Sequence, residues 1–426
     1  MQAFNPLTAC QYAESISYPR AVGTRGETSA RAKIADLLEG MGLQVEHQQV
    51  AFSTGFGTFL SIEIFTSQIL ILGALGLSAI HTDLVFIPVV SLVLLIALTG
   101  PLNRSVKAHS FAPKPGETPS LWSRLCYSLG THYASANILG KFPDSRDDPG
   151  VPHLFLVAHS DSKSQRISLV TRMILFAISI SGGLLFAGLI SLGFFIPWFT
   201  TISYYLALVV LSASLPLLFL DFGNASPGAI DDASGVGLVL HLAEVLIAQP
   251  QISEQFRISV LISSAEELAT MGTMAYVKDH VVALGKQTKM GGLHILNFDG
   301  IGVRGDLYLV GPRRRAVSEK HPSLPDVIQD SCVQLGLKIR EFILPGALFD
   351  HIPFAEAGFD AVSLIAIGKK TRYVHSPGDS ADKLDPRGFD QAGRVALKVI
   401  VQLSEANISY DQKALEPHRK AVWTDA

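Results

Sequence analysis

Histidines and carboxylates recur in this sequence at the ends of apolar segments, and their chemistry is that of a divalent-metal site. His159 and Asp161 follow an apolar run in HLFLVAHSD, and His375 lies in the polar stretch YVHSPGDS. The carboxylates placed in a similar way are Asp231, Asp232, Glu266, Glu267 and Asp299. Imidazole and carboxylate groups together, with no cysteine in the set, suit zinc, and also manganese or cobalt.

Each motif alone has an ordinary structural explanation. A His-x-Asp pair at a strand end is more often a satisfied polar pair, and a Glu-Glu pair is usually solvated surface. An Asp-Asp pair in a glycine-rich loop usually caps a helix, which is a role open to Asp232. All five motifs, however, lie at the ends of apolar elements in one alternating pattern of strands and helices. Polar residues that merely cover a protein surface would not explain this arrangement. We therefore interpret them as parts of one site.

The elements that must position these residues alternate between strands and helices. Strands are expected at 45–52, 135–142, 153–159, 256–265, 292–299, 306–311 and 361–367. Helices are expected at 27–42, 233–247, 323–336 and 387–405. We expect the strands 135–142 and 153–159 to be neighbours. The alternation predicts an α/β fold with a mixed, largely parallel sheet flanked by helices, whose ligands gather beyond the carboxyl ends of the strands.

Two long apolar segments interrupt this pattern. Residues 64–82 and 84–103 contain no Asp, Glu, Lys or Arg, and neither does the stretch from Met173 to Leu220. A bilayer span needs ~20 apolar residues. The first segment accommodates spans at roughly 58–80 and 84–101, and Pro197 divides the second segment into two more. Four transmembrane helices are therefore predicted. The alternative, a helical hairpin buried in the protein core, is less favoured because so long an uncharged run exceeds what a core of this size hides.

Composition excludes several functional classes. Charged residues make up 17% of the chain, below the roughly one quarter that is usual for a soluble protein. The net charge of -3 lacks the excess of positive charge that is typical of proteins that bind nucleic acid. Three cysteines are too few for a disulfide framework, and the N-terminal residues show no pattern of a cleavable signal peptide.

The order of the motifs resembles a known family. AHSDS, PGAIDDASG, SSAEELATMG, LNFDGIG and YVHSPGDSADKLD follow one another as in the zinc-dependent aminopeptidases of the leucyl aminopeptidase and glutaminyl cyclase type. The resemblance covers nearly all of the polar sequence, including YPRAVGTRG near the N-terminus. It implies a zinc exopeptidase fold, two Zn²⁺ ions per chain with Mn²⁺ or Co²⁺ as substitutes, and hydrolysis of N-terminal residues from peptides.

The same resemblance gives each candidate residue a role. The terminal metal ligands would be His159, Glu267, Asp299 and His375. Asp231 would be the carboxylate that bridges the two metals, and Glu266 the general base. Asp161 would hold the ring of His159, as metal-bound histidines generally require. Because neighbouring side chains of an extended segment alternate, we expect Glu267 to bind metal while Glu266 stays free.

The sequence departs from the family before the last histidine. Relatives can have a carbonyl-polarising aromatic residue directly before that histidine, whereas this chain has Val374. Tyr373 and Arg372 are the candidates for a substrate-binding role there. The stretch HSDSK, which contains Lys163, resembles glutaminyl cyclases in sequence, whereas the stretch DDASG resembles the peptidases. Two other functions therefore stay open, a glutaminyl-cyclase-like acyltransferase and a catalytically inactive membrane receptor or scaffold.

These observations predict the organisation of the chain. Residues 1–55, 103–166 and 222–426 would form one metallopeptidase domain, with transmembrane hairpins at 56–102 and 167–221. The second hairpin begins soon after Asp161 and ends about ten residues before Asp231, a length that spans at most ~35 Å. We therefore expect the metal centre to lie near the lipid surface. The expected partners are a peptide substrate and the lipid bilayer.

The basic residues predict which side of the membrane holds the metallopeptidase domain. Those near the membrane entries are Arg104, Lys107, Lys163, Arg166 and Arg172. The opposite tips, His81–Asp83 and Phe194–Thr201, contain neither Lys nor Arg. Because cytoplasmic loops carry the excess of Lys and Arg, we expect an integral membrane protein with a cytoplasmic catalytic domain. The alternative is that these basic residues serve only the soluble fold.

Overall fold

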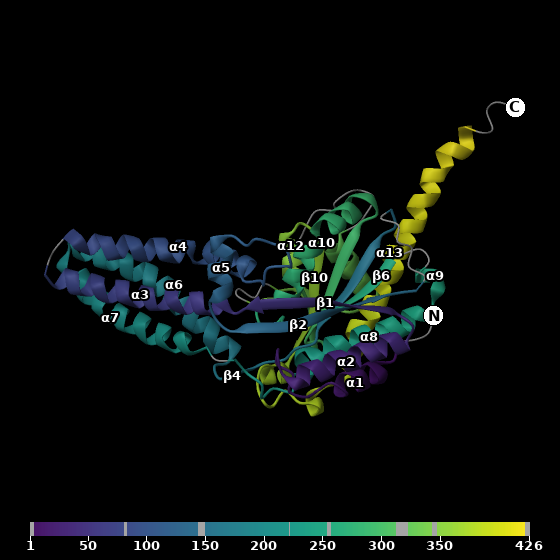
Figure 1. The fold of residues 1–426 in the computed structure, drawn as a ribbon, viewed down its shortest axis with the longest axis horizontal. Helices are drawn as coiled ribbons and strands as arrows, with labels where there is room; N and C mark the ends of the chain where they lie inside the picture. The colour runs from purple at the N-terminus through teal and green to yellow at the C-terminus, as the bar shows by residue number, and fades with distance from the viewer. Residues whose placement is uncertain are drawn as a thin grey trace. The chain divides into compact units, whose positions relative to one another are not determined.

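The structure is a computed structural model that describes residues 4–80, 83–143, 150–220, 222–253, 257–311, 323–342 and 347–421 (Figure 1). The chain forms two compact units. The first, which we call the sheet unit, comprises Met1–Val50, Ala134–Ser164 and Gly223–Ala426. The second, the helical unit, comprises Ala51–Tyr133 and Gln165–Phe222.

An eight-stranded mixed sheet is the centre of the sheet unit. Its strands, in spatial order, are β1 (Gln44–Ser53), β2 (His132–Lys141), β6 (Arg257–Ser263), β3 (His153–His159), β7 (Leu293–Asp299), β10 (Asp360–Gly368), β8 (Gly305–Val310) and β9 (Ile339–Glu341). A separate two-stranded sheet pairs β4 (Ser164–Gln165) with β5 (Phe222–Gly223). The α/β fold predicted from the alternation is confirmed.

The four central strands are parallel, and this arrangement determines where the polar residues meet. β6, β3, β7 and β10 run in one direction, whereas β2 and β8 are antiparallel to their inner neighbours. The expected pairing of strands 135–142 and 153–159 is wrong, because β6 lies between β2 and β3. The carboxyl ends of the four parallel strands share one edge of the sheet, where ligands gather in such folds.

Helices cover both faces of the sheet. They are α1 (Pro6–Glu14), α2 (Arg25–Gly40), α8 (Ser234–Ile247), α9 (Pro250–Ser253), α10 (Met271–Met290), α11 (Leu324–Gln334), α12 (His351–Glu356) and α13 (Pro386–Ala421). Alternate side chains of β3 point to opposite faces. Leu154 and Leu156 join the core that α1, α2, α8, α11 and α13 cover, while Phe155 and Val157 join the core that α10 and α12 cover. The far end of α13 projects away from the sheet (Figure 1).

One strand boundary and one helix differ from the sequence-based expectation, and both lie next to the site. The strand expected at 256–265 ends at Ser263, so Glu266 and Glu267 lie in the loop beyond it. The alternation of side chains along a strand therefore does not explain their different directions. The twenty-residue helix α10 follows that loop and was not anticipated, because its apolar positions are too irregular for a clear helical stripe.

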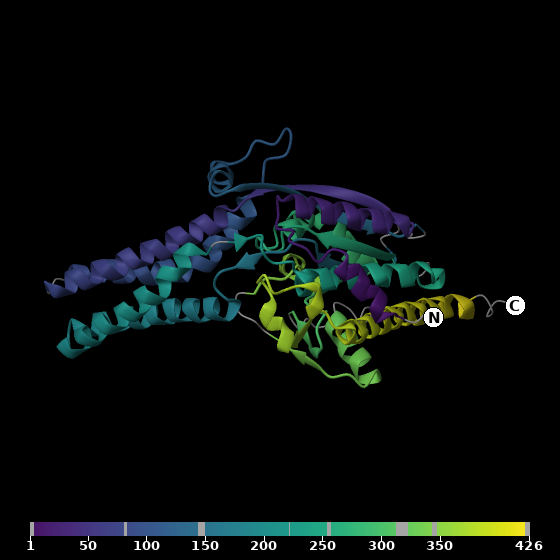
Figure 2. The same ribbon diagram turned by 90° about the horizontal axis from the view of Figure 1, so that it is seen from below.

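Four long helices make up most of the helical unit. They are α3 (Gly55–Ala79), α4 (Phe86–His109), α6 (Leu169–Gly193) and α7 (Pro197–Ser214), joined by the short α5 (Leu121–Ser128) and two 3-10 turns, η1 (Asp83–Val85) and η2 (Leu215–Phe219). Figures 1 and 2 show α3 beside α4 and α6 beside α7. The division of the second apolar segment at Pro197 is confirmed, since α7 begins at that residue. The first tip, around His81 and Thr82, lies outside the described residues.

Large apolar side chains cover the outside of these helices. Ile71, Phe186, Ile190 and Val210 pack in the small core between them. Only 22% to 33% of the most apolar stretch of each helix is buried, which is the opposite of a hairpin hidden in a protein core. All four helices are long and apolar enough to cross a bilayer, with mean hydropathies from 1.8 to 2.5. The assignment of 56–102 and 167–221 to membrane hairpins stays a prediction.

Candidate metal centre

The edge where the parallel strands end holds all five residues proposed as metal ligands. His159 is the last residue of β3 and Asp299 the last of β7. Glu267 lies in the loop after β6, and Asp231 lies in η3 (Ala229–Ala233), directly before α8. His375 follows η4 (Lys369–Tyr373), the turn after β10. Residues separated by up to 216 positions therefore meet, because the carboxyl ends of the four parallel strands lie at the same edge of the sheet.

The five side chains form two groups of three that share Asp231. His159, Asp231 and Asp299 offer ligand atoms that all lie within 4.8 Å of one another, and so do Asp231, Glu267 and His375. Asp231 Oδ1 is 3.0 Å from His159 Nε2, and Asp231 Oδ2 is 3.0 Å from His375 Nε2. One carboxylate therefore directs each of its oxygens to a different imidazole, which is the arrangement that a pair of metal ions requires of a bridging ligand.

The donor atoms of these groups fit divalent metals. His159 is buried, and its Nδ1 lies 3.1 Å from the carbonyl oxygen of Asp161, so a neutral ring carries its lone pair on Nε2. Among the described residues, His159 Nε2 and Glu267 Oε1 have no hydrogen-bond partner and are buried, although Nε2 is close to Asp231. Buried polar atoms are almost always paired, and unpaired ones of these types suit a bound cation.

The surrounding charges support the same reading. Burial raises the pKa of Asp299 well above its ordinary value, with the carboxylates of Asp231 and Asp232 adding to the shift. Burial also raises the pKa of Glu266 well above its ordinary value; His159 opposes this, and Glu267 and Asp299 reinforce it. Clustered buried carboxylates that resist ionisation are stabilised when a cation neutralises them.

Glu266 belongs to neither group of three. Its Oε2 lies 3.8 Å from His159 Nε2, so it borders the first group, whereas Glu267 Oε2 lies 3.1 Å from His375 Nε2 in the second. Ala265, directly before them, has a φ of 55°, in the left-handed region that favours glycine. This turn of the backbone, rather than strand alternation, sends the two glutamates to different imidazoles.

Asp161 positions the same loop. Its two carboxylate oxygens accept hydrogen bonds from the backbone N–H groups of Glu266, at 3.2 Å, and Glu267, at 3.1 Å. Its carbonyl oxygen faces the ring of His159 at 3.1 Å, while its carboxylate is farther from that ring, at 3.6 Å. Asp161 thus links β3 to the loop after β6, which is a wider role than the ring contact expected from the resemblance.

Two further aspartates hold the Asp231 loop. Asp232, proposed as a possible helix cap, accepts hydrogen bonds from the N–H groups of Gly235 at 2.8 Å and Gly300 at 3.1 Å, and so joins the start of α8 to the end of β7. Asp379 accepts hydrogen bonds from the N–H groups of Ile230 and Asp231. Asp379 was not singled out from the sequence, although it lies four residues after His375 in a quoted motif.

Arg20 is a second residue that sequence reasoning missed. Its guanidinium is fully buried and donates to the carbonyl oxygens of Ser160 at 2.8 Å and Gly228 at 2.8 Å, as well as to that of Pro227. It therefore ties the loop after β3 to the loop before Asp231. The available signal was the position of Arg20 in YPRAVGTRG, where an arginine stands among residues that match the family.

Lys163 contributes a positive charge beside the second group. Its Nζ lies 2.6 Å from Glu267 Oε2 and donates to the backbone carbonyl of Glu267 at 3.2 Å. The pKa of Glu267 is lowered because His375 and Lys163 outweigh the effect of burial. Glu267 is therefore ionised, which suits the proposed role of a metal ligand.

A third residue that sequence reasoning missed, Asp350, is buried behind the site. It accepts hydrogen bonds from the hydroxyl groups of Ser263 and, at 2.7 Å, Thr273. Burial raises its pKa to about 6. Asp350 thereby fixes the end of β6 against α10.

The residues before His375 lie at the border of the site. Arg372 is exposed and donates to the hydroxyl of Tyr373 at 3.1 Å, with its guanidinium 5.0 Å from the centre of the ring. Val374 packs against the main core. The substrate-binding role proposed for Tyr373 and Arg372 stays a prediction.

Comparisons with known proteins concern both sequence and fold. Residues 200–400 match the model of peptidase family M28, a range that contains four of the five proposed ligands and leaves out His159. Aminopeptidase YwaD of Bacillus subtilis (strain 168) is 28% identical over 187 residues. That match covers 42% of this chain and 38% of the relative, so the chain is aligned with well under half of that protein.

Solved structures extend the likeness over most of the chain. A zinc aminopeptidase from Bacillus subtilis covers 94% of this chain and 96% of its own, with a TM-score of 0.53 and 14% identity. A glutaminyl cyclase from Porphyromonas gingivalis covers 94% and 99%, with a TM-score of 0.50 and 12% identity. The fold is thus that of the zinc exopeptidases. Together with the match of residues 200–400 to peptidase family M28, this fold confirms the resemblance seen in the motifs.

Proposed function

We propose that this protein is a membrane-anchored aminopeptidase that uses two zinc ions. The observation that carries the proposal is Asp231, whose two carboxylate oxygens each lie 3.0 Å from the imidazole of a different group of three. His159 and Asp299 would hold one ion, and Glu267 and His375 the other, with Asp231 shared. The activity of the M28 relatives supports the reaction class.

The proposed reaction assigns a separate task to Glu266. When bound, two divalent ions polarise the scissile carbonyl and make a water molecule acidic enough to attack near neutral pH. Glu266 accepts the proton of that water and delivers it to the leaving amine. Its raised pKa suits this exchange, because a group that titrates nearer to neutrality both takes and gives a proton readily.

The chain's other residues keep this geometry in place. Asp161 fixes the backbone of Glu266 and Glu267, and Asp379 fixes that of Asp231. Because these contacts are made to the backbone, they set the positions of the functional side chains without competing for the metal ions. Reacting groups must be held to within a fraction of an ångström for efficient catalysis.

The membrane anchor is the second part of the proposal. Four helices with an apolar exterior support it, and the interruption of both apolar segments near their middle supports two hairpins. With an even number of crossings, both chain ends and all polar segments would lie on one side, and the distribution of Lys and Arg favours the cytoplasm.

A direct test uses the full-length protein purified in detergent. We expect elemental analysis to find two zinc-class ions per chain and an aminoacyl amide to be hydrolysed. A peptide with an N-terminal Gln is assayed in parallel for ring closure. Ring closure without hydrolysis would replace the peptidase by the glutaminyl-cyclase alternative. Two bound metals without either reaction would favour the inactive receptor or scaffold.

The anchor is tested separately on membranes from expressing cells. We expect the protein to stay with the membrane after alkaline carbonate washing and to need detergent for extraction. Release by carbonate would contradict the four spans, whatever the enzyme assay shows.

A further inference from the structure

The short helix α5 is fastened to one end of the first candidate hairpin, where it contacts both α3 and α4. The indole N–H of Trp122 donates to the hydroxyl of Ser105 in the last turns of α4, at 3.1 Å. The carbonyl oxygen of Cys126 accepts a hydrogen bond from the hydroxyl of Ser53, just before α3, at 3.1 Å. The same carbonyl leaves no room for a Cβ atom at Gly55, the first residue of α3. α5 is therefore packed closely against the ends of both helices.

One face of α5 is exposed and largely apolar. The exposed residues of this helix are Leu121, Arg124, Leu125 and Ser128. Their spacing of three, four and seven positions places them on one side of the helix, whereas Cys126 is buried on the other. Leu121 is 84% exposed and Leu125 is 50% exposed. Two large apolar side chains thus point away from the protein, with one positive charge beside them.

α5 packs at the end of an exposed apolar strip on α4. Leu94 and Leu98 are 55% and 48% exposed, and Pro101 is exposed as well. Ser105, the contact of Trp122, follows them at the same helical spacing and so lies on the same side of α4. The strip belongs to one of the four candidate spans. The exposed face of α5 is therefore continuous with a surface that the proposed function assigns to lipid.

The level of α5 along α4 corresponds to the end of the candidate span. Residues 84–103 contain no Asp, Glu, Lys or Arg, and Arg104 and Lys107 follow directly, so Ser105 lies where charged residues resume. Tryptophan is favoured at this depth of a membrane protein, and Trp122 contacts Ser105 there. The attachment of α5 thus coincides with the expected level of the lipid headgroups.

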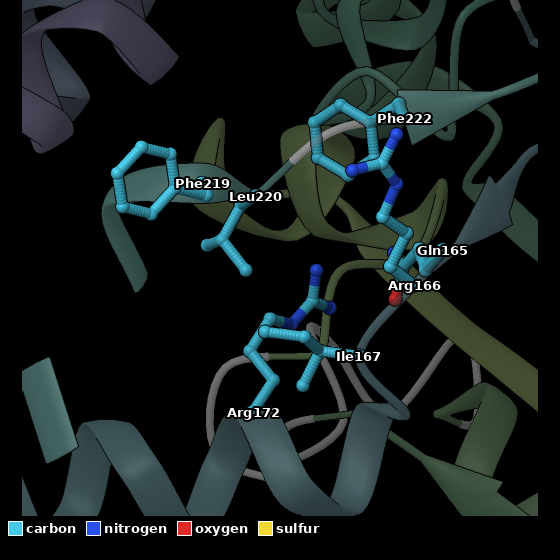
Figure 3. A pocket seen from close by; sticks show the side chains of 7 residues that line it. All are labelled: Gln165, Arg166, Ile167, Arg172, Phe219, Leu220 and Phe222. Atoms are coloured by element: carbon cyan, nitrogen blue, oxygen red, sulfur yellow. The ribbon is translucent and has the colours of Figure 1, made fainter. Parts of the chain in front are cut away.

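The ends of the second candidate hairpin combine the same kinds of side chain. Figure 3 shows Arg166, and Arg172 from the first turns of α6, near Phe219 and Phe222. Phe219 is 66% exposed and Phe222 is 46% exposed. Both hairpins therefore place basic residues beside exposed apolar ones at the ends of their candidate spans, as is typical of the boundary between headgroups and acyl chains.

The direction of α5 suits this boundary. In Figure 2 the short blue helix α5 is seen nearly end-on, whereas α3 and α4 run along the plane of the view. α5 therefore lies crosswise to these two helices. A helix that crosses the direction of the spans lies along the membrane surface, with one face toward lipid and the other toward protein.

We propose that α5 is an interfacial helix whose exposed face, with Leu121 and Leu125, enters the headgroup region of the bilayer that the four candidate spans cross. The apolar face of such a helix is buried by about 5–10 Å at the boundary of headgroups and acyl chains, and its basic residues stay among the headgroups. Arg124 has the second role. The proposal rests on the membrane anchor of the proposed function and is independent of the peptidase activity.

The test uses an environment-sensitive fluorescent label on single introduced cysteines of the full-length protein in phosphatidylcholine nanodiscs. The label is quenched by iodide in the water, or by lipids that carry a spin label either near the headgroup or near the end of the acyl chain. The variants are Leu121→Cys in α5, Leu208→Cys in α7 and Val282→Cys in α10, at positions that are 84%, 66% and 84% exposed. The native cysteines are buried and take up little label.

Each position has its own expected result. The label at residue 121 should emit at shorter wavelength than the label at residue 282, and iodide should quench it severalfold less. The lipid labelled near the headgroup should quench it most. Residue 208, in a candidate span, should be quenched most by the lipid labelled near the chain end. Residue 282, the matched apolar position in the sheet unit, should be quenched by iodide alone.

The three positions separate the ways in which the proposal fails. If residue 121 behaves like residue 282 while lipid quenches residue 208, the spans stand and the interfacial role of α5 is wrong. Protection of residue 121 from iodide and from both lipid labels would show that a protein surface, such as a second copy of this chain, covers α5, and would also overturn the proposal. Quenching of residue 208 by iodide alone would contradict the membrane anchor itself, and the proposal would fall with it.

Discussion

At the scale of single residues, Glu266 and Glu267 are adjacent carboxylates with different expected effects on substitution. Glu266→Gln should retain both metals, because Glu266 belongs to neither group of three, yet lose about 10²–10⁴ in turnover. Glu267→Gln should lower the metal content, because it removes one oxygen from the group around His375. Turnover with an aminoacyl amide and elemental analysis measure the two effects. Near wild-type turnover of Glu266→Gln would show that another residue is the base.

The pH dependence of the metal-free protein depends on buried carboxyl groups. Burial raises the pKa of Asp232 to about 8 and that of Asp379 to about 7. An unfolded aspartate has a pKa of about 3.9, so above that pH the folded protein holds protons that the unfolded chain has released. Stability therefore falls as pH rises, by about 1.4 kcal/mol per pH unit for each such group until its folded pKa is reached.

Because stability falls as pH rises, we predict that the chelator-treated protein unfolds at a lower temperature at about pH 8 than at about pH 5. The raised pKa of His375, where Glu267 outweighs the effect of burial, acts in the same direction. Asp379→Asn should flatten the slope between about pH 4 and 7, and added zinc should raise the midpoint most at the higher pH. Thermal unfolding with and without zinc measures this. A midpoint that rises with pH in chelator would contradict the prediction.

At the scale of secondary structure, the contact between α6 and α7 depends on a glycine. A Cβ atom at Gly182 would lie 2.7 Å from Cγ2 of Val210, whereas no atom of the described residues lies within 4 Å of a Cβ atom at Gly188 in the same helix. Small residues allow membrane helices to approach closely. Gly182→Leu should therefore destabilise the protein by about 1–3 kcal/mol, and Gly188→Leu, which adds the same side chain, should have little effect.

Thermal unfolding in detergent compares these two variants directly. If the change at residue 188 lowered the midpoint as much as the change at residue 182, the effect would come from the altered composition of the helix and not from its packing against α7.

At the scale of the whole molecule, the four predicted spans determine which residues face outside. Phe195, between α6 and α7, is 73% exposed, and Val282 in α10 of the sheet unit is 84% exposed. In intact cells, Phe195→Cys should react with an impermeant thiol reagent and Val282→Cys should not. The native cysteines, Cys10, Cys126 and Cys332, are buried and give little background. Reaction of Val282→Cys together with protection of Phe195→Cys would place the sheet unit outside the cytoplasm.

Much of this architecture was predictable because it depends on local patterns. Continuous apolar runs predicted strands such as β3 and β7, and the polar residue that ends each run placed His159 and Asp299 at the edge of a sheet. The uncharged segments predicted four long helices with a break at Pro197, and the motif order indicated the family. The strands, the helices and the break depend on residues within one element, and the motif order is a property of the linear chain, so the sequence contains all of them directly.

The remaining features depend on contacts between distant residues. Arg20 bonds to carbonyl groups more than 200 positions away, β6 enters the sheet between β2 and β3, and Asp161 accepts hydrogen bonds from the backbone of Glu266 and Glu267. The spacing of apolar residues along the sequence does not predict such pairs, because they form when strands that are far apart in the chain lie side by side. Asp231 is the clearest case: its position in a glycine-flanked loop suggested a ligand, but the sharing of its two oxygens between His159 and His375 follows from the parallel order of β3, β7 and β10.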